Sequence, residues 1–460
     1  MSMSTHHGLP LDDDIVDRIM TFCSTFGTLK STILVSKAFY RVFQTRPKSI
    51  TRAVAYNIFG PALPQALRVV RYPYHDYTSP SDDPVAMAEA CPEDHTHSFI
   101  TVEEQEKLQE NSKVVAALED VYSVINKDRT SKTSVLTSDE SWRFRRAMYR
   151  IMLYCNQFPG SGFIQYDDES IENIRKQRTA VLSEYSTNEL LQLHSAVKFL
   201  RRIFFNLSGI GVFYFLCHSA LVADAVPRDS ILIDALLSAG PSGALRGWEA
   251  RTYGVLEDDI DFEPFENDEE NPLFVGYLSL PLENIWTARD ITPPKEDEPV
   301  SKWILDQVNG ANDTCSQCSH PGGLSLYTEA NWQRFPVFLT NLLKGHLKRN
   351  PTIAQPFFAA TSHLVNADAL GPFIGDLFPL TAHTAPAFDG WERTGSYCFA
   401  CLTKFLEEHL WVWWLEERIK SGWTPPENCW YGWNCRTQTH KQSHADTKNH
   451  LCAPIKGDPV

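Results

Sequence analysis

The 460-residue sequence lacks the short motifs through which many enzymes hold phosphates, metals or nucleophiles. It contains no GxxxxGK[ST] loop, no GxGxxG after a strand, no HExxH and no GxSxG. Its adjacent thiol and imidazole, Cys217 and His218, fall in a helical pattern, where neighbouring side chains point to different faces. The sequence therefore predicts a protein that is not itself a catalyst.

Long apolar runs are also missing. The most apolar stretch, residues 203–226, is interrupted by Asn206, His218 and Asp224, whereas a membrane span needs about 20 clean apolar residues. The N-terminus shows no basic segment followed by an apolar one, so no secretory signal is expected. These absences predict a soluble protein of the cytoplasm, the nucleus or both.

Strand-like alternation is scarce, while helical periodicity is frequent. Apolar residues make up 43% of the chain, which is ample for a folded core. In the segment that begins at Glu189, leucines and other apolar residues recur every three or four positions, as on one face of a helix. We therefore expect a mainly α fold, with an N-terminal three-helix unit, a helical middle region and a metal-stabilised helical C-terminal region.

Positive charge is in deficit: 42 Lys and Arg stand against 57 Asp and Glu, a formal net charge of −15. The deficit is local, because residues 251–300 alone hold 14 acidic and 3 basic residues. Nine of these carboxylates fall in residues 257–270. This pattern is typical of a solvated acidic loop rather than of an acidic surface throughout.

Proline-rich and acidic stretches divide the sequence into segments. Four prolines with Ser and Asp between them indicate a linker over residues 73–100. The expected organisation is an N-terminal unit at 8–52, a helical extension at 53–72, a linker at 73–100, a helical region at 101–250, an acidic loop and linker at 251–300, a CxxC-containing helical region at 301–426 and a Cys/His module at 427–453.

The N-terminal unit has the most specific pattern. Leu9-Pro10 opens it, apolar residues at helical spacing follow, and Val35-Ser36-Lys37-Ala38-Phe39 lies further on. This pattern resembles the F-box, a three-helix unit that docks on the Skp-type adaptor of an SCF (Skp–cullin–F-box) ubiquitin ligase. The resemblance implies that the adaptor is contacted by Leu9, Pro10, Ile15, Ile19, Leu29, Val35 and Phe39.

Seven of the eleven cysteines follow residue 314, mostly in pairs, which in a chain without a secretory signal indicates metal binding rather than disulfides. Cys315/Cys318 and Cys398/Cys401 are two CxxC units, and together they would form one four-thiolate zinc site. His320 is a substitute ligand. Two unconnected thiol pairs are the alternative.

A second group, at the C-terminal end, combines Cys429, Cys435, His444 and His450. Two thiolates and two imidazoles suit tetrahedral zinc, and the spacing would fold a short segment round one ion. A tail that closes the domain without metal is the alternative.

The opening of this segment, Cys429-x-Tyr431-Gly432-x-x-Cys435, resembles the poly(ADP-ribose)-binding zinc finger. Eight residues separate Cys435 from His444, where that family has six. His440 and Cys452 therefore remain rival ligands.

These resemblances imply a function as the substrate-recognition adaptor of an SCF-type ubiquitin ligase. The N-terminal unit would bind the Skp-type adaptor and, through it, the cullin complex, and the remainder would bind an unknown target protein. Two alternatives stay open. One is a zinc-dependent protein that binds nucleic acid or poly(ADP-ribose), and the other is an interaction scaffold without a ligase role.

Overall fold

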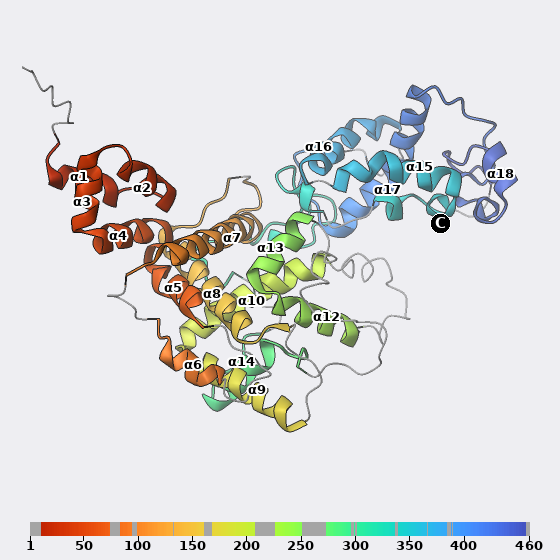
Figure 1. The fold of residues 1–460 in the computed structure, drawn as a ribbon. Coiled ribbons are helices and arrows are strands. Elements are labelled where there is room, and N and C mark those ends of the chain that lie inside the picture. The colour runs from red at the N-terminus through yellow and green to blue at the C-terminus, as the bar shows by residue number, and fades with distance from the viewer. Residues whose placement is uncertain are drawn as a thin grey trace, which may run out of the picture. The chain divides into compact units, whose positions relative to one another are not determined.

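The protein is mainly α-helical, as the sequence predicts, and its described residues contain isolated β-bridges but no sheet. Within these residues no helix has both the length and the apolar character that a membrane crossing requires. The computed structural model describes residues 11–73, 83–93, 99–131, 133–160, 168–207, 226–250, 273–295, 299, 301–335, 339–365, 367–383, 388 and 390–456 (Figure 1).

The chain forms two compact units. The first comprises residues 1–122, 136–210 and 217–306, and the second comprises residues 123–135, 211–216 and 307–460. The acidic segment 257–270 lies outside the described residues.

The first unit begins with four short helices (Figure 1). Their bounds are α1 (Asp13–Thr21), α2 (Phe26–Ile33), α3 (Lys37–Thr45) and α4 (Pro47–Phe59). Side chains cap two of them: the Thr25 hydroxyl accepts a hydrogen bond from the Thr28 N–H, and the Ser36 hydroxyl accepts one from the Phe39 N–H. Pro47 starts α4, where a helix has no partner for an N–H. The four helices pack on one another as a small bundle.

Two expected boundaries do not coincide with the structure. Helix α4 runs through position 52 to Phe59, so the N-terminal unit does not end there. Part of the expected linker is helical, since α6 (Pro84–Ala90) lies within residues 73–100. The buried Arg68 guanidinium donates hydrogen bonds to the carbonyls of Ala88 and Cys91, at 3.0 and 2.7 Å. The linker prediction is therefore wrong for residues 83–93, which pack on the domain.

The rest of the first unit is built round α8. This helix is buried along most of its length and packs against α5, α10 and α13. A reciprocal capping box between Thr137 and Glu140 starts it. The further elements are η1 (Gly60–Ala62), α5 (Leu63–Arg71), α7 (Val102–Asn126), α8 (Ser138–Gln157), α9 (Asp168–Ser183), α10 (Thr187–Leu207), α12 (Val226–Ser238), α13 (Gly240–Ala250) and α14 (Ser279–Ala288).

A charged network crosses the interior of this unit. The Arg150 guanidinium, 5% exposed, donates to the Glu93 carboxylate at 2.8 Å and to the Glu189 carboxylate at 2.9 Å, and it lies over the Tyr185 ring. Burial alone would raise the pKa of Glu189, but hydrogen bonds from Ser186 and the Arg150 charge lower it to about 2. Glu189 therefore stabilises the fold above its ordinary pKa, and this contribution is lost as the pH falls towards 2.

Replacing Arg150 by Met is expected to lower the free energy of unfolding by roughly 3 kcal/mol, because two carboxylates lose their shared cation. Urea unfolding followed by circular dichroism measures this change.

The stability of the Glu189→Gln variant should fall less steeply than that of the intact protein between about pH 5 and about pH 3. The control is Lys176→Met, which breaks an exposed pair with Glu172 and should change stability by less than about 0.5 kcal/mol. Equal effects of Arg150→Met and Lys176→Met would contradict this account.

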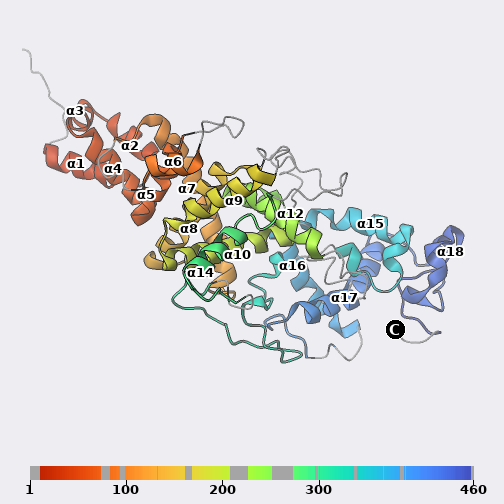
Figure 2. The same cartoon turned by 90° about the horizontal axis from the view of Figure 1, so that it is seen from below.

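The second unit packs three longer helices and several 3₁₀ turns round one aromatic-rich core (Figure 2). Trp332, Phe357, Phe405 and Trp414 contribute to this core, and so does Leu451. Leu451 lies in the same core. The expected Cys/His module, residues 427–453, therefore packs as part of the second unit. The elements are η4 (Gly323–Ser325), η5 (Trp332–Arg334), η6 (Leu339–Leu342), η7 (Leu347–Arg349), α15 (Pro351–Thr361), η8 (Ser362–Val365), α16 (Ala367–Leu377), η9 (Phe378–His383), α17 (Phe399–Lys420), η11 (Gly432–Asn434), η12 (Arg436–Thr439) and α18 (Gln442–Thr447).

Candidate metal centres and docking surface

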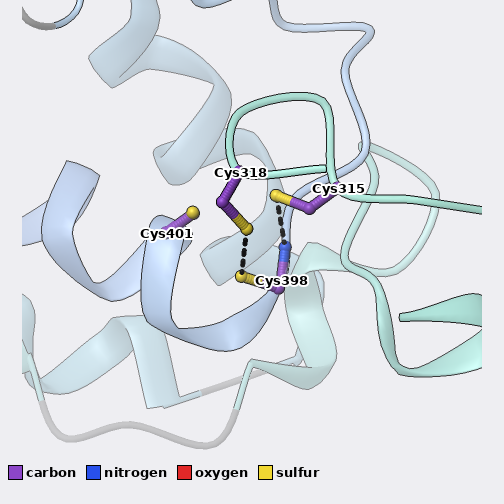
Figure 3. A group of neighbouring side chains, drawn as sticks. All are labelled: Cys315, Cys318, Cys398 and Cys401. Atoms are coloured by element: carbon purple, nitrogen blue, oxygen red, sulfur yellow. Dashed lines mark hydrogen bonds between the residues drawn. The ribbon is translucent and has the colours of Figure 1, made fainter. Parts of the chain in front are cut away.

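The two CxxC units meet at the start of α17 (Figure 3). Cys315 and Cys318 lie in a tight turn, Cys398 is the residue before α17, and Cys401 is in the first turn of that helix. The four sulfur atoms all lie within 4.8 Å of one another. We call these four residues the first centre. The group could hold a metal ion.

Backbone hydrogen bonds hold the two halves of the first centre together. Tyr327 and Tyr397 pair through reciprocal N–H···O bonds of 2.7 and 2.9 Å. Next to this bridge, the Ser316 N–H donates to the Ser396 carbonyl at 2.7 Å. The two segments are therefore fixed side by side although about 80 residues separate them in the chain. His320, the substitute ligand considered above, is exposed and outside the group.

The first centre favours at least one thiolate. Burial alone would raise the pKa of Cys315, but backbone N–H groups, including that of Cys398 at 3.3 Å, lower it to about 6. Burial and the neighbouring thiols raise the pKa of Cys401. Four thiolates so close together would repel one another, and a divalent cation would offset that repulsion. A soft cation such as Zn²⁺ fits this donor set.

The second centre consists of Cys429, Cys435, His444 and His450, whose ligand atoms also lie within 4.8 Å of one another. The His444 Nε2 is 3.6 Å from the Cys429 sulfur and 3.3 Å from the Cys435 sulfur. Helix α18 carries His444, and the segment after it carries His450. This group too could hold a metal ion.

The environment of His450 fits a metal ligand. Its side chain is only 1% exposed, yet neither ring nitrogen has a hydrogen-bond partner among the residues that the structure describes. Burial and the neighbouring His444 lower its pKa to about 4, so its imidazole is neutral at physiological pH. A buried polar group without a partner is unfavourable, and a coordinated metal ion would satisfy one of the two nitrogens.

The rival ligands of the second centre lie elsewhere. His440 is exposed, and its ring faces the Thr439 hydroxyl at 3.5 Å. The Cys452 thiol donates to the backbone carbonyls of Cys429 and Asn449, at 3.6 and 3.4 Å. Neither residue belongs to the group of mutually close ligand atoms. The geometry therefore favours the four residues named first over both rivals.

Gly432 lets the chain turn between Cys429 and Cys435. Its φ is +42°, and a Cβ there would lie 2.1 Å from the Cys452 carbonyl oxygen. We expect Gly432→Ala to lower the free energy of unfolding of the second unit by more than about 3 kcal/mol and to weaken metal binding at the second centre. Thermal unfolding and zinc titration against a chromogenic chelator measure the two effects.

Gly422 provides the matched control. Its φ is +91°, but apart from its chain neighbours no described residue has an atom within 4 Å of the position of a Cβ. Gly422→Ala therefore carries only the backbone strain, about 1–2 kcal/mol, and should leave zinc affinity unchanged. If both variants lose stability equally, close packing at Gly432 does not shape the second centre.

The helical bundle at the N-terminus exposes large apolar side chains. Ile15 and Ile19 in α1 and Phe22, the residue directly after it, follow one another at helical spacing and are 47%, 41% and 78% exposed. Leu34 and Val35, between α2 and α3, are 76% and 63% exposed. We call these five residues the apolar surface.

The residues that the F-box resemblance implies as adaptor contacts differ in their exposure. Leu29 and Phe39 are buried, at 3% and 5% exposure, so they hold the bundle together and present little surface to a partner. Phe22 and Leu34, which the sequence reasoning missed, are the most exposed members of the apolar surface. The remaining assigned residues, Leu9 and Pro10, lie outside the described residues.

Comparisons with known proteins return nothing: the chain matches no protein-family model, no curated protein and no solved structure.

Proposed function

We propose that this protein is a substrate-recognition adaptor of an SCF-type ubiquitin ligase. The α1–α4 bundle would bind the Skp-type adaptor, and the rest of the chain would bind a target protein. The observation that carries this proposal is the apolar surface, which lies in the segment whose sequence resembles the F-box. In this role the chain makes and breaks no covalent bond. It raises the effective concentration of the target near the ligase.

The exposure of the apolar surface supports a docking role. Phe22, Leu34 and Val35 are each more than 60% exposed, and full burial of such a side chain contributes about 1.5–3 kcal/mol. Five large exposed apolar side chains on one small bundle give it apolar area that a partner protein could bury. A partner with a complementary apolar groove would recover this free energy, as in helix-in-groove recognition.

We further propose that both centres bind zinc and that zinc serves structure here. Four thiolates, or two thiolates with two imidazoles, form the closed ligand sets of structural zinc sites. The first centre ties the turn at Cys315 to the start of α17, and the second holds the segment that carries Leu451 into the core. The cation would thereby stabilise the second unit, from which a target could be held.

The test is complex formation between the zinc-loaded full chain and a purified Skp-type adaptor, followed by size-exclusion chromatography with light scattering. A stoichiometric complex is expected. If a folded, zinc-loaded chain elutes separately from the adaptor at micromolar concentrations, the ligase role is wrong. An interaction scaffold would then be the better account.

A further inference from the structure

Four positively charged or basic residues gather on the second unit. Lys348 and Arg349 lie in η7, with His346 just before it, and Arg436 begins η12. Lys348, Arg349 and Arg436 are exposed, while His346 is half-buried. Burial, followed by the charges of Arg436, Arg349 and Lys348, lowers the pKa of His346, so all three cations act on the same imidazole. We call these four residues the cationic patch.

Hydrogen bonds fix the two halves of the cationic patch against each other. The His346 N–H donates to the Trp433 carbonyl at 2.8 Å. The fully buried Asn350 side chain donates to the Gln438 side chain at 2.9 Å. Gly345 has a φ of +57°, and a Cβ at this position would lie 2.7 Å from the same Trp433 carbonyl oxygen. The absence of a side chain at Gly345 therefore allows the two segments to approach this closely. The backbone segments that carry these charged residues are therefore fixed next to each other by the fold.

The two arginines of the patch have no acidic partner among the described residues. Arg349 and Arg436 form no salt bridge there, whereas the nearby Lys344 pairs with Glu408. Burial raises the pKa of Glu407, and the charge of Lys348 offsets part of that rise. Like charges held close together repel one another. In a chain with a formal net charge of −15, such a concentration of unpaired guanidinium groups is typical of a preorganised anion site.

We propose that the cationic patch binds an anionic peptide segment, whose carboxylate or phosphate oxygens pair with Arg349 and Arg436. A guanidinium donates two parallel hydrogen bonds to either oxyanion, so both kinds of anionic side chain share this chemistry. That the peptide belongs to a ubiquitination target rests on the proposed function. Peptide binding itself does not depend on the ligase.

Two observations favour a peptide over a nucleic acid. Binding of single strands usually combines cations with exposed aromatic rings. Trp433 accepts the hydrogen bond from the His346 N–H, so it is the aromatic residue joined to the patch. Its side chain is half-buried and stacks on Trp411, and the Lys344 ammonium lies 4.5 Å from the centre of its ring. Charges act over about 8–10 Å at physiological salt. A short anionic peptide can therefore place all of its charges within this range of the patch.

The experiment measures binding of fluorescein-labelled peptides to the zinc-loaded full chain by fluorescence anisotropy, without the Skp-type adaptor. The probes are a peptide rich in Asp and Glu, a serine-rich peptide with phosphoserines, its unphosphorylated form and an oligothymidylate. We expect at least one anionic peptide to bind, more weakly at higher salt, and the unphosphorylated serine peptide not to bind. The comparison of the first two probes shows which oxyanion is preferred.

The variant Arg349→Glu/Arg436→Glu is expected to weaken this binding at least about tenfold, while Arg349→Lys/Arg436→Lys retains part of it. The matched control is Lys107→Glu/Lys420→Glu, which reverses two exposed cations elsewhere and should retain the affinity. Equal losses in the two reversal variants, tighter binding of the oligothymidylate, or no binding of either anionic peptide would overturn the proposal. Because the adaptor is absent, failure here leaves the ligase role to be judged by its own test.

Discussion

Replacing both Leu34 and Val35 by Asp is expected to abolish binding of the Skp-type adaptor while the helical bundle stays folded. Both side chains are more than 60% exposed in the free protein, so the substitutions remove no core contact. In the complex they would lose about 1.5–3 kcal/mol of apolar burial each and would place unpaired carboxylates in an apolar contact. We therefore expect the dissociation constant to rise more than about 100-fold.

Isothermal titration calorimetry with the purified adaptor measures this change, and circular dichroism checks the fold. Phe358, in α15 of the second unit, is 57% exposed and lies outside the bundle. Phe358→Asp should therefore bind the adaptor as the intact chain does. Unchanged adaptor affinity of the Leu34→Asp/Val35→Asp variant would show that the apolar surface is not the docking site.

A variant at Leu29 distinguishes loss of bundle stability from loss of a direct contact with the adaptor. Because this side chain is buried, Leu29→Ala should destabilise the bundle by about 2–5 kcal/mol. Adaptor binding should then fail only under conditions in which the bundle unfolds.

Loss of one ligand from either centre is expected to release one equivalent of zinc and to unfold the second unit. Cys401→Ser removes a ligand of the first centre, and Cys435→Ser removes one of the second. Structural zinc contributes about 10–16 kcal/mol in small peptides, which exceeds or matches the typical stability of a domain, about 5–15 kcal/mol. Both centres adjoin one core, since Leu402 and Leu451 both belong to it. Either loss should therefore affect the whole unit.

Elemental analysis of the purified variants gives their zinc content, and tryptophan fluorescence reports unfolding of the second unit. The matched control is Cys452→Ser, because this thiol donates hydrogen bonds to backbone carbonyls and lies outside the group of mutually close ligand atoms. That variant should keep two equivalents of zinc and the fold. Full zinc content in Cys401→Ser or Cys435→Ser would show that the corresponding centre does not hold the metal.

The residues of both candidate metal centres could be inferred from the sequence because members of each Cys or His pair lie only a few residues apart. A CxxC unit brings two sulfur atoms together within one turn of chain, whatever the rest of the protein does. What spacing could not decide was whether Cys315/Cys318 meets Cys398/Cys401. That meeting depends on the bridge between Tyr327 and Tyr397.

In the expected linker, by contrast, local composition led to a wrong prediction. Its prolines and polar residues favoured an irregular segment, but Pro84 takes the first position of a short helix, where proline is well tolerated. The buried Arg68 then holds the end of that helix through carbonyl groups. Tertiary contacts overrode composition.

The sequence by itself determined the helical class and the residue types of both candidate centres, because helical periodicity and the short spacings within each Cys or His pair act over a few residues. Only the tertiary structure decided which apolar side chains are buried and which are exposed. A helix of nine residues such as α1 presents apolar positions on more than one side, and packing of the neighbouring helices buries Val16 and Met20 but leaves Ile15 and Ile19 exposed. The cationic patch follows the same rule: Lys348 and Arg349 are adjacent in the chain, but Arg436 joins them through hydrogen bonds between segments more than 80 residues apart.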